Sequence, residues 1–436
     1  MLTGDVTCRA DLDTFYTEGA GISILGTTIA IAFADTQCGP LEKLLGFSLG
    51  NPVCAPDIDT DTDTQHTLTQ VPRPNSLVVA DIGSTGRYTS ITIGADGLPV
   101  ISYREGGGAD DLRVLKCTTP DCSTSGATTV DGPGAVGEYT SIAIGTDGFP
   151  VISYYDATNT GLKLAKCGDA ACSTSSTALV DSGAANDVGR QNSLTIGTDG
   201  LPVISYRDAT ALTLNVAHCD DDACLPGGNT ITVVAGPDVG EDTSIAIGVD
   251  GLPVISYRDK NANDLALYRC GSANCSTGSA VTVDPDAGNV GRATSLTIGV
   301  DGFPIISYYD STNFDLRVAK CTDVDCTAPA TISIVETSGD VGSPSSITIG
   351  ADGLPVISYH DATTGSLRVV HCGDASCTPA ANVFTTLDLG PVVGTFNSIT
   401  VGADGLPIVA YRDETNGALK VAKCANVLCL PNWSRR

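Results

Sequence analysis

The chain has 436 residues, of which 49 are glycine and 5% aromatic, and its formal net charge is −27. So acidic a protein binds nucleic acid and anionic membranes poorly, which argues against both as partners. The longest apolar stretch, around Ile22–Ala34, is interrupted by Gly26 and two threonines and is too short to span a membrane. Acidic residues precede it, unlike the start of a signal peptide, so we expect the export signal to be missing from this chain.

Residues 1–74 do not repeat, and we interpret them as an N-terminal assembly segment and linker. Gly19–Ile31 alternates apolar and small residues about a Leu-Gly turn, which predicts two short strands. Pro40–Phe47 predicts a short helix. Asp57–Thr64 is interpreted as a polar linker rather than a calcium loop, because the glycine and final glutamate of such a loop are absent.

The pattern of Gly19–Ile31 resembles the shaft repeats of trimeric viral and phage fibres. The resemblance implies that residues 1–60 assemble subunits and that the rest of the chain is a displayed head. The alternative is a strand pair packed on the side of the main domain. Three cysteines of this segment, Cys8, Cys38 and Cys54, leave at least one unpaired within it, and their pairing stays open.

A repeat dominates the chain beyond residue 74. The motif Ser-Ile/Leu-x-Ile/Val-Gly-x-Asp-Gly-Leu/Phe-Pro-Val/Ile-Ile/Val-Ser/Ala-Tyr occurs seven times, at steps of 51 or 52 residues. In the second unit, Ser141–Gly145, Pro150–Asp156, Leu162–Cys167 and Thr177–Val180 predict four strands, called a, b, c and d. Four short strands in a repeat of this length predict one blade of a β-propeller.

The two ends of the array predict that the ring is closed. The last unit has strands a to c but no strand d, whereas Ser76–Asp81 matches the d strands and precedes the first unit. We therefore expect residues 75–436 to form an all-β, seven-bladed propeller whose last blade is completed by the N-terminal strand. Such closure leaves no open sheet edge at the seam.

Each unit carries Cys-x4-Cys after strand c, where a short c–d hairpin brings two cysteines within reach of a disulfide. A structural zinc site needs four ligands, and each pair lies in its own blade, so we predict disulfides rather than metal sites. The predicted disulfides are Cys117–Cys122, Cys167–Cys172, Cys219–Cys224, Cys270–Cys275, Cys321–Cys326, Cys372–Cys377 and Cys424–Cys429.

Strand b of every unit ends in Tyr-x-Asp or Tyr-x-Glu and enters the b–c loop. We predict that the x positions form a ring that binds a protein or glycan, because arginine pairs with carboxylates and tyrosine suits interfaces. The alternative is structural, with the following carboxylates capping the b–c turns. The predicted ring consists of Arg104, Tyr155, Arg207, Arg258, Tyr309, His360 and Arg412.

From Ser90–Gly94 through Pro99–Tyr103 to Leu112–Val114, the repeat resembles those of secreted bacterial propellers of sialidase-like and NHL-like appearance. The resemblance implies an extracellular or cell-surface propeller but no activity, because one fold hosts many functions. The Asp-box of sialidases, Ser-x-Asp-x-Gly-x-Thr-Trp, is not matched, so no sialidase residue is carried over.

No unique nucleophile, base or carboxylate pair breaks the repeat, so we expect no catalytic residue, metal ion or cofactor. The expected function is an extracellular, non-enzymatic binding or adhesion module. One alternative is a structural subunit of a surface fibre, assembled through residues 1–60. Another is a polysaccharide-acting enzyme that uses two carboxylates of the acidic loops.

Overall fold

The computed structural model describes residues 75–430, apart from 133, 184–185 and 287, and the backbone of six further strands. The chain divides into two compact units, residues 1–71 with 435–436 and residues 72–434. Within the described residues, no helix has the length and apolar character needed to cross a membrane. The six further strands are β1 (Ile22–Leu25), β2 (Thr28–Ile31), β3 (Glu42–Ser48), β4 (Asn51–Pro56), β5 (Gln70–Arg73) and β34 (Asn432–Arg435).

In the N-terminal unit, β1 and β2 pair antiparallel, which confirms the two strands predicted within Gly19–Ile31. The helix predicted over Pro40–Phe47 is wrong, because Glu42–Ser48 is strand β3 and pairs with β4. So short a helix is marginal on its own, and pairing with a partner strand overrides the local preference. Cys8, Cys38 and the linker predicted over 57–64 lie outside the described residues.

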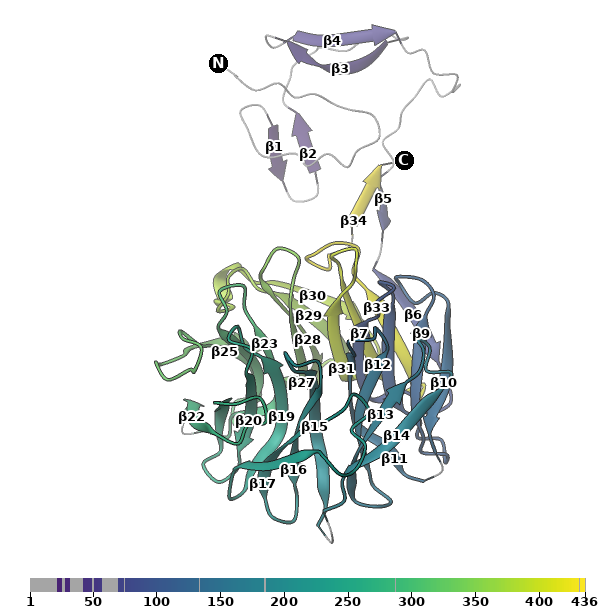
Figure 1. The fold of residues 1–436 in the computed structure, drawn as a ribbon. Helices are drawn as coiled ribbons and strands as arrows, with labels where there is room; N and C mark the ends of the chain where they lie inside the picture. The colour runs from purple at the N-terminus through teal and green to yellow at the C-terminus, as the bar shows by residue number, and fades with distance from the viewer. Residues whose placement is uncertain are drawn as a thin grey trace. The chain divides into compact units, whose positions relative to one another are not determined.

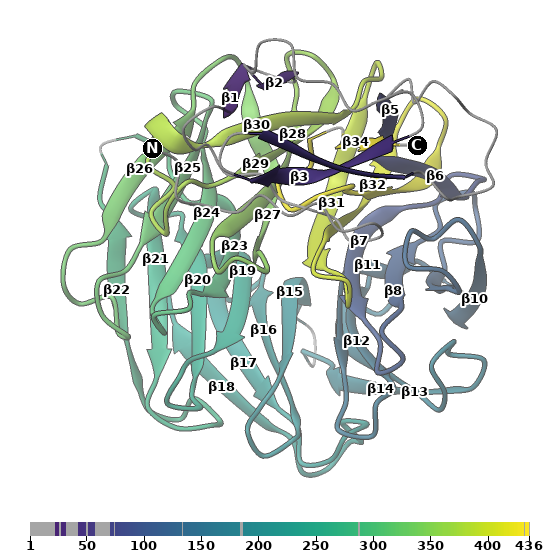
Figure 2. The same ribbon diagram turned by 90° about the horizontal axis from the view of Figure 1, so that it is seen from above.

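The larger unit contains seven four-stranded antiparallel sheets, one for each predicted blade (Figures 1 and 2). In each blade the strands follow one another in sequence order from a to d, except that blade 7 takes strand d from the N-terminal side. The a strands are β7 (Arg87–Ile93), β11 (Val136–Ile144), β15 (Val188–Ile196), β19 (Val239–Ile247), β23 (Arg292–Ile298), β27 (Val341–Ile349) and β31 (Val393–Val401).

The b strands all begin at a proline, where a missing backbone N–H is tolerated. They are β8 (Pro99–Arg104), β12 (Pro150–Asp156), β16 (Pro202–Asp208), β20 (Pro253–Asp259), β24 (Pro304–Asp310), β28 (Pro355–Asp361) and β32 (Pro407–Asp413). The c strands are β9 (Leu112–Cys117), β13 (Gly161–Cys167), β17 (Thr213–His218), β21 (Asp264–Cys270), β25 (Asp315–Lys320), β29 (Ser366–His371) and β33 (Ala418–Lys423).

The outer strands are β10 (Ser125–Asp131), β14 (Ser175–Asp181), β18 (Thr230–Ala235), β22 (Gly278–Asp284), β26 (Thr331–Glu336), β30 (Val383–Asp388) and β6 (Ser76–Asp81). A short 3-10 helix, Pro379–Ala381, lies in the c–d loop of blade 6. Strand β6 pairs antiparallel with β33 of the last blade, with Val78 opposite Val421. This pairing confirms the predicted closure of the ring.

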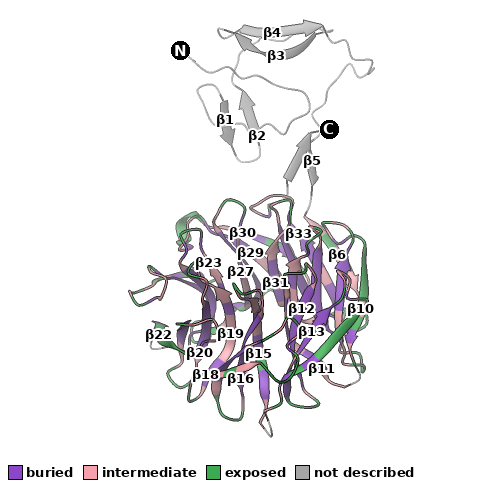
Figure 3. Ribbon diagram, viewed as in Figure 1, coloured by how far each residue is buried: buried purple, intermediate pink, exposed green. Residues whose placement is uncertain are grey.

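The core lies between the blades rather than inside them. Strand b is buried along almost its whole length, whereas strand d is exposed at its start and then alternates between buried and exposed residues (Figure 3). Each cluster of buried side chains joins two successive blades, and the seventh joins Ile101 and Tyr103 of blade 1 to Ile408 and Val421 of blade 7. No blade therefore buries its apolar faces without both of its neighbours.

The tyrosine near the end of strand b ties this core to the preceding blade. The Tyr154 hydroxyl donates to Asp131, at the end of strand d in blade 1, over 2.6 Å, and Lys163 contacts the same carboxylate. Five other blades repeat the tyrosine–carboxylate bond. Blade 4 departs from the pattern, because Ala235 stands at the carboxylate position.

All seven predicted disulfides are present, with Cα–Cα distances of 4.6–5.0 Å. Their second cysteine lies within the loop rather than on strand d, because the cross-strand partner of Cys167 is Ser175 and not Cys172. The second cysteines take left-handed backbone angles, with φ between 51° and 57°. Seven such bonds indicate an oxidising environment.

Removing one disulfide is expected to weaken the ring measurably. The double variant Cys270→Ala/Cys275→Ala should lose roughly 2 kcal/mol of unfolding free energy, since the bond no longer restricts the unfolded chain. Urea unfolding followed by circular dichroism measures the change, with the native chain under reductant as the comparison. An unchanged midpoint would show that this bond adds nothing to stability.

Candidate functional site

The residues predicted to bind a ligand at the ends of the b strands are all buried, with exposed fractions of 1–8%. Their polar atoms reach the loop that enters the next blade. Arg207 contacts Asp238 over 2.9 Å and the carbonyl oxygen of Val239 over 3.1 Å. The Tyr155 hydroxyl donates to Asp187 over 2.7 Å.

The other members of this ring make equivalent contacts. Arg104 reaches Glu138, Arg258 reaches Asn289, and Arg412 donates to the carbonyl oxygen of Thr85. Within their own blades the same arginines also pair with Asp110, Glu241 and Glu414, respectively. Tyr309 donates to Asp340, and Nδ1 of His360 lies 2.8 Å from the carbonyl oxygen of Val393. Each of the seven residues thus acts as a fastener that links its own blade to the next one. That they bind a ligand stays a prediction.

The aspartates that follow these residues cap the b–c turns. Oδ1 of Asp156 accepts hydrogen bonds from the backbone N–H groups of Thr158 and Asn159, each over 3.0 Å. Its Oδ2 accepts from the Asn159 side chain over 2.9 Å. This is the structural alternative that the sequence left open for these carboxylates.

On the opposite face, each Asp of an a–b turn pairs with the basic residue that precedes the first cysteine of its own blade. Lys116 pairs with Asp96 over 2.8 Å, and His218 and His371 occupy the equivalent position in blades 3 and 6. This pairing accounts for both histidines beside the disulfides. Within the described residues, no group of His, Cys, Asp or Glu has the arrangement of a metal site.

The innermost strands enclose the centre of the ring (Figure 2), and we call the space between them the central channel. Each of these strands contacts the next, and β31 contacts β7. A serine on each strand accepts a hydrogen bond from a backbone N–H of the following blade, as Ser90 does from Ile142 over 3.2 Å. Seven such bonds of 3.0–3.2 Å run around the channel, and the bond from Ile91 to Ser398 completes the circle.

Each innermost strand also bulges near its start. In β11 the register shifts between Glu138 and Ser141, so Tyr139 lies in the bulge with a φ of 55°. A β-bulge re-aims the side chain that it carries. Five other blades hold a residue other than glycine at positive φ here, and in blade 6 Pro344 follows a cis peptide bond.

The bulge residues line a hollow of about 800 Å³ at one mouth of the central channel. We call these seven residues the channel ring. They comprise six residue types in the seven blades, although the glycine two positions before and the serine two positions after are the same in all seven. The channel ring consists of Tyr88, Tyr139, Gln191, Asp242, Ala293, Pro344 and Phe396.

The channel ring was not predicted from the sequence. Its signal is variation between an invariant glycine and an invariant serine, which becomes visible when the seven units are aligned from Gly137 to Ser141 and their equivalents. The sequence alone does not show which way this side chain points. In an unbroken strand alternate residues face towards and away from the channel, and the bulge changes that alternation.

The carboxylates that line the hollow differ in their partners. Glu241 pairs with Arg258 and Lys260, and Glu414 pairs with Arg412. Asp242 accepts hydrogen bonds from the Gln191 side chain over 2.6 Å and from the backbone N–H of Ala293 over 3.0 Å. Burial raises the pKa of the Asp242 carboxyl, and the nearby Glu241 adds to this effect.

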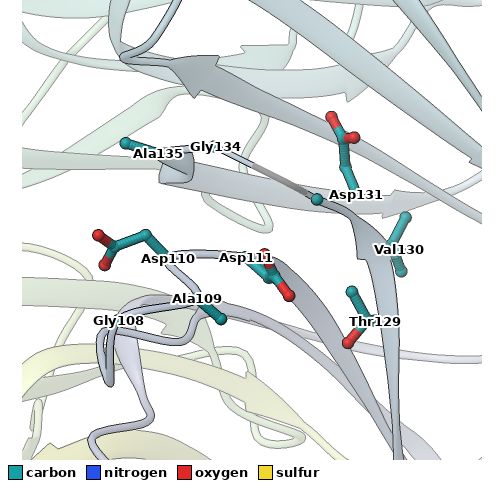
Figure 4. Close-up of a pocket in the computed structure, with 10 residues that line it drawn as sticks. Gly108, Ala109, Asp110, Asp111, Thr129, Val130, Asp131, Gly134 and Ala135 are labelled. Carbon is teal, nitrogen blue, oxygen red and sulfur yellow. The ribbon is translucent and has the colours of Figure 1, made fainter.

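A second hollow, of about 710 Å³, lies between the b–c loop of blade 1 and the loop that leads into blade 2 (Figure 4). Its lining includes Asp110, Asp111 and Asp131. Two of these carboxylates already have partners, since Asp110 pairs with Arg104 and Asp131 with Lys163. We therefore place the candidate site at the channel ring.

No family model matches the chain, and no curated protein matches its sequence. Its fold is similar to that of a Dyadobacter fermentans protein of unknown function, with 12% identity and a TM-score of 0.52 over 81% of this chain and 98% of that one. It is also similar to Kuenenia stuttgartiensis hydrazine synthase, with 11% identity and a TM-score of 0.52 over 80% of this chain and 97% of that chain.

A sialidase from Streptococcus pneumoniae shares 9% identity, with a TM-score of 0.45 over 84% of this chain and 71% of the sialidase. The two structures with TM-scores of 0.52 share the fold of this chain, and identities of 11–12% carry no activity across.

The role of Arg207 as a fastener can be tested without any ligand. Arg207→Met should lower the unfolding free energy by about 2 kcal/mol, because it leaves the Val239 carbonyl and the facing carboxylates without their buried partner. Arg190→Met is the control and should change stability little, because this arginine is exposed and its ion pair with Asp187 is open to solvent. Equal stabilities of the two variants in urea would contradict the fastener role.

Proposed function

We propose that the protein is an extracellular, non-enzymatic binding module that takes its ligand at the channel ring. The observation that carries the proposal is the variation of seven equivalent residues within an otherwise regular repeat. The serine two positions after the bulge, whose hydroxyl links each blade to the next, is the same in all seven blades. Residues that differ at equivalent backbone positions are free to serve recognition instead.

The geometry of the channel ring supports the same proposal. The hollow of about 800 Å³ has the volume of a small-molecule or side-chain site, and aromatic, amide and carboxylate groups line it together. Non-glycine residues at positive φ are uncommon, and such backbone is concentrated at functional sites. Binding is favoured over catalysis because Glu241 and Glu414 are held in ion pairs and are not available as a free acid and base.

The proposal predicts that filling the channel mouth abolishes binding. Ala293→Tyr places in blade 5 the side chain that blades 1 and 2 already carry, at a φ of 50° that matches theirs of 52° and 55°. The variant should fold normally and lose the ligands of the native chain by more than tenfold, because the added ring occupies the hollow. Ligand-observed NMR against a fragment library measures this loss.

The matched control is Val300→Tyr, which adds the same ring at an exposed turn between strands a and b, where the native valine is 77% exposed. It should bind like the native chain. If Ala293→Tyr is folded, as judged by its thermal transition, and keeps every ligand of the native chain, the channel ring is not the binding site.

A further inference from the structure

The channel ring is not symmetric, and its aromatic residues lie on three consecutive blades. The Tyr88 ring centroid is 4.7 Å from that of Tyr139 and 4.8 Å from that of Phe396. Burial raises the pKa of both tyrosines, so the rings stay neutral phenols. Blades 7, 1 and 2 therefore present a continuous arc of electron-rich rings at the channel mouth.

Blades 4 and 5 face this arc across the channel, because the ring has seven members and these two lie farthest from blade 1. Blade 4 contributes Asp242 and blade 5 the small Ala293. Among the described residues, no Lys, Arg or His forms an ion pair with the Asp242 carboxylate, which accepts hydrogen bonds from two neutral donors, the Gln191 side chain and the Ala293 N–H. Arg292 and Arg258 act on its charge only from beyond ion-pair distance. A partly buried carboxylate without an ion-pair partner is stabilised when a counter-charge binds directly to it.

We propose that the channel ring binds an organic cation of the alkylammonium class, seated between the aromatic arc and Asp242. Aromatic faces attract ammonium groups, most strongly when water is excluded, and quaternary ammonium ions are a common ligand of aromatic cages. The facing carboxylate supplies the counter-charge. The net charge of −27 raises the local concentration of cations around the whole molecule.

A positive charge at the edge of the hollow opposes the binding of a cation and provides a further test of the ligand's charge. Arg292 lines the same hollow and is exposed, next to the bulge residue Ala293. Its guanidinium repels a bound cation through water, so Arg292→Gln should strengthen the binding of an ammonium ligand. An anionic ligand would respond in the opposite direction.

This inference rests on the proposed binding function, and the experiment separates the two. Calorimetric titration of the full chain compares choline with its neutral carbon analogue, 3,3-dimethylbutan-1-ol, which has the same shape and lacks the charge. Choline should bind at least about tenfold more tightly, a ratio within the range of cation–π and carboxylate contributions. A peptide with trimethyl-lysine, against its unmodified form, distinguishes a protein side chain from a free amine as the source of the cation.

Four variants locate the effect. Asp242→Asn keeps an oxygen for the Ala293 N–H and should weaken choline binding about tenfold, whereas Asp111→Asn, in the second acidic hollow, should not change it. Tyr88→Leu should weaken choline binding several-fold. Tyr88→Phe keeps the aromatic ring and should bind choline about as tightly as the native chain.

Equal binding of choline and the neutral analogue, no binding of choline, or no effect of Asp242→Asn would overturn the cation proposal. If fragments of another chemistry still bind and Ala293→Tyr still abolishes them, the channel remains the binding site and only the ligand class is wrong. If Ala293→Tyr changes the binding of no ligand, both proposals fall.

Discussion

The structure depends on a circle of hydrogen bonds that no blade can complete alone. The serine of each innermost strand accepts from the backbone of the next blade, and Ile91 donates to Ser398 to close the circle. The apolar clusters obey the same constraint, because each is shared by two blades. The ring therefore requires all seven units in one register, and it requires β6 to complete the last of them.

That constraint explains which residues repeat. The disulfides recur in all seven blades, the strand b tyrosine bonds in six, and a polar residue that reaches the next blade, Arg, Tyr or His, lies near the end of every strand b, so their recurrence is a structural requirement. The channel ring lies at an equally regular backbone position, yet its side chains range from Ala293 to Phe396. If the channel ring binds a ligand, as we propose, the residues for ring closure and those for recognition occupy different positions within each unit.

Most of the fold could be predicted from the sequence, since a repeat with regular strand spacing and an orphan strand at Ser76–Asp81 specifies a closed propeller. The disulfide pairs followed from their spacing, but the loop position of Cys172 did not, because hairpin length is set by the backbone turn. The helix at Pro40–Phe47 failed because pairing with β4 outweighs local preference. The proposed binding site was not predicted because recurrence drew attention to Arg207 and its equivalents, whereas the channel ring is marked by variation inside a bulge.

The most direct test is the thermal unfolding of a variant with alanine at all seven channel-ring positions, measured by calorimetry together with its ligand binding. If the channel ring serves recognition, the midpoint should fall by no more than about 5 °C while binding is lost, because the hydrogen-bonded circle beneath it is unchanged. A fall of tens of degrees, or failure to fold, would contradict the account by showing that the channel ring holds the blades together.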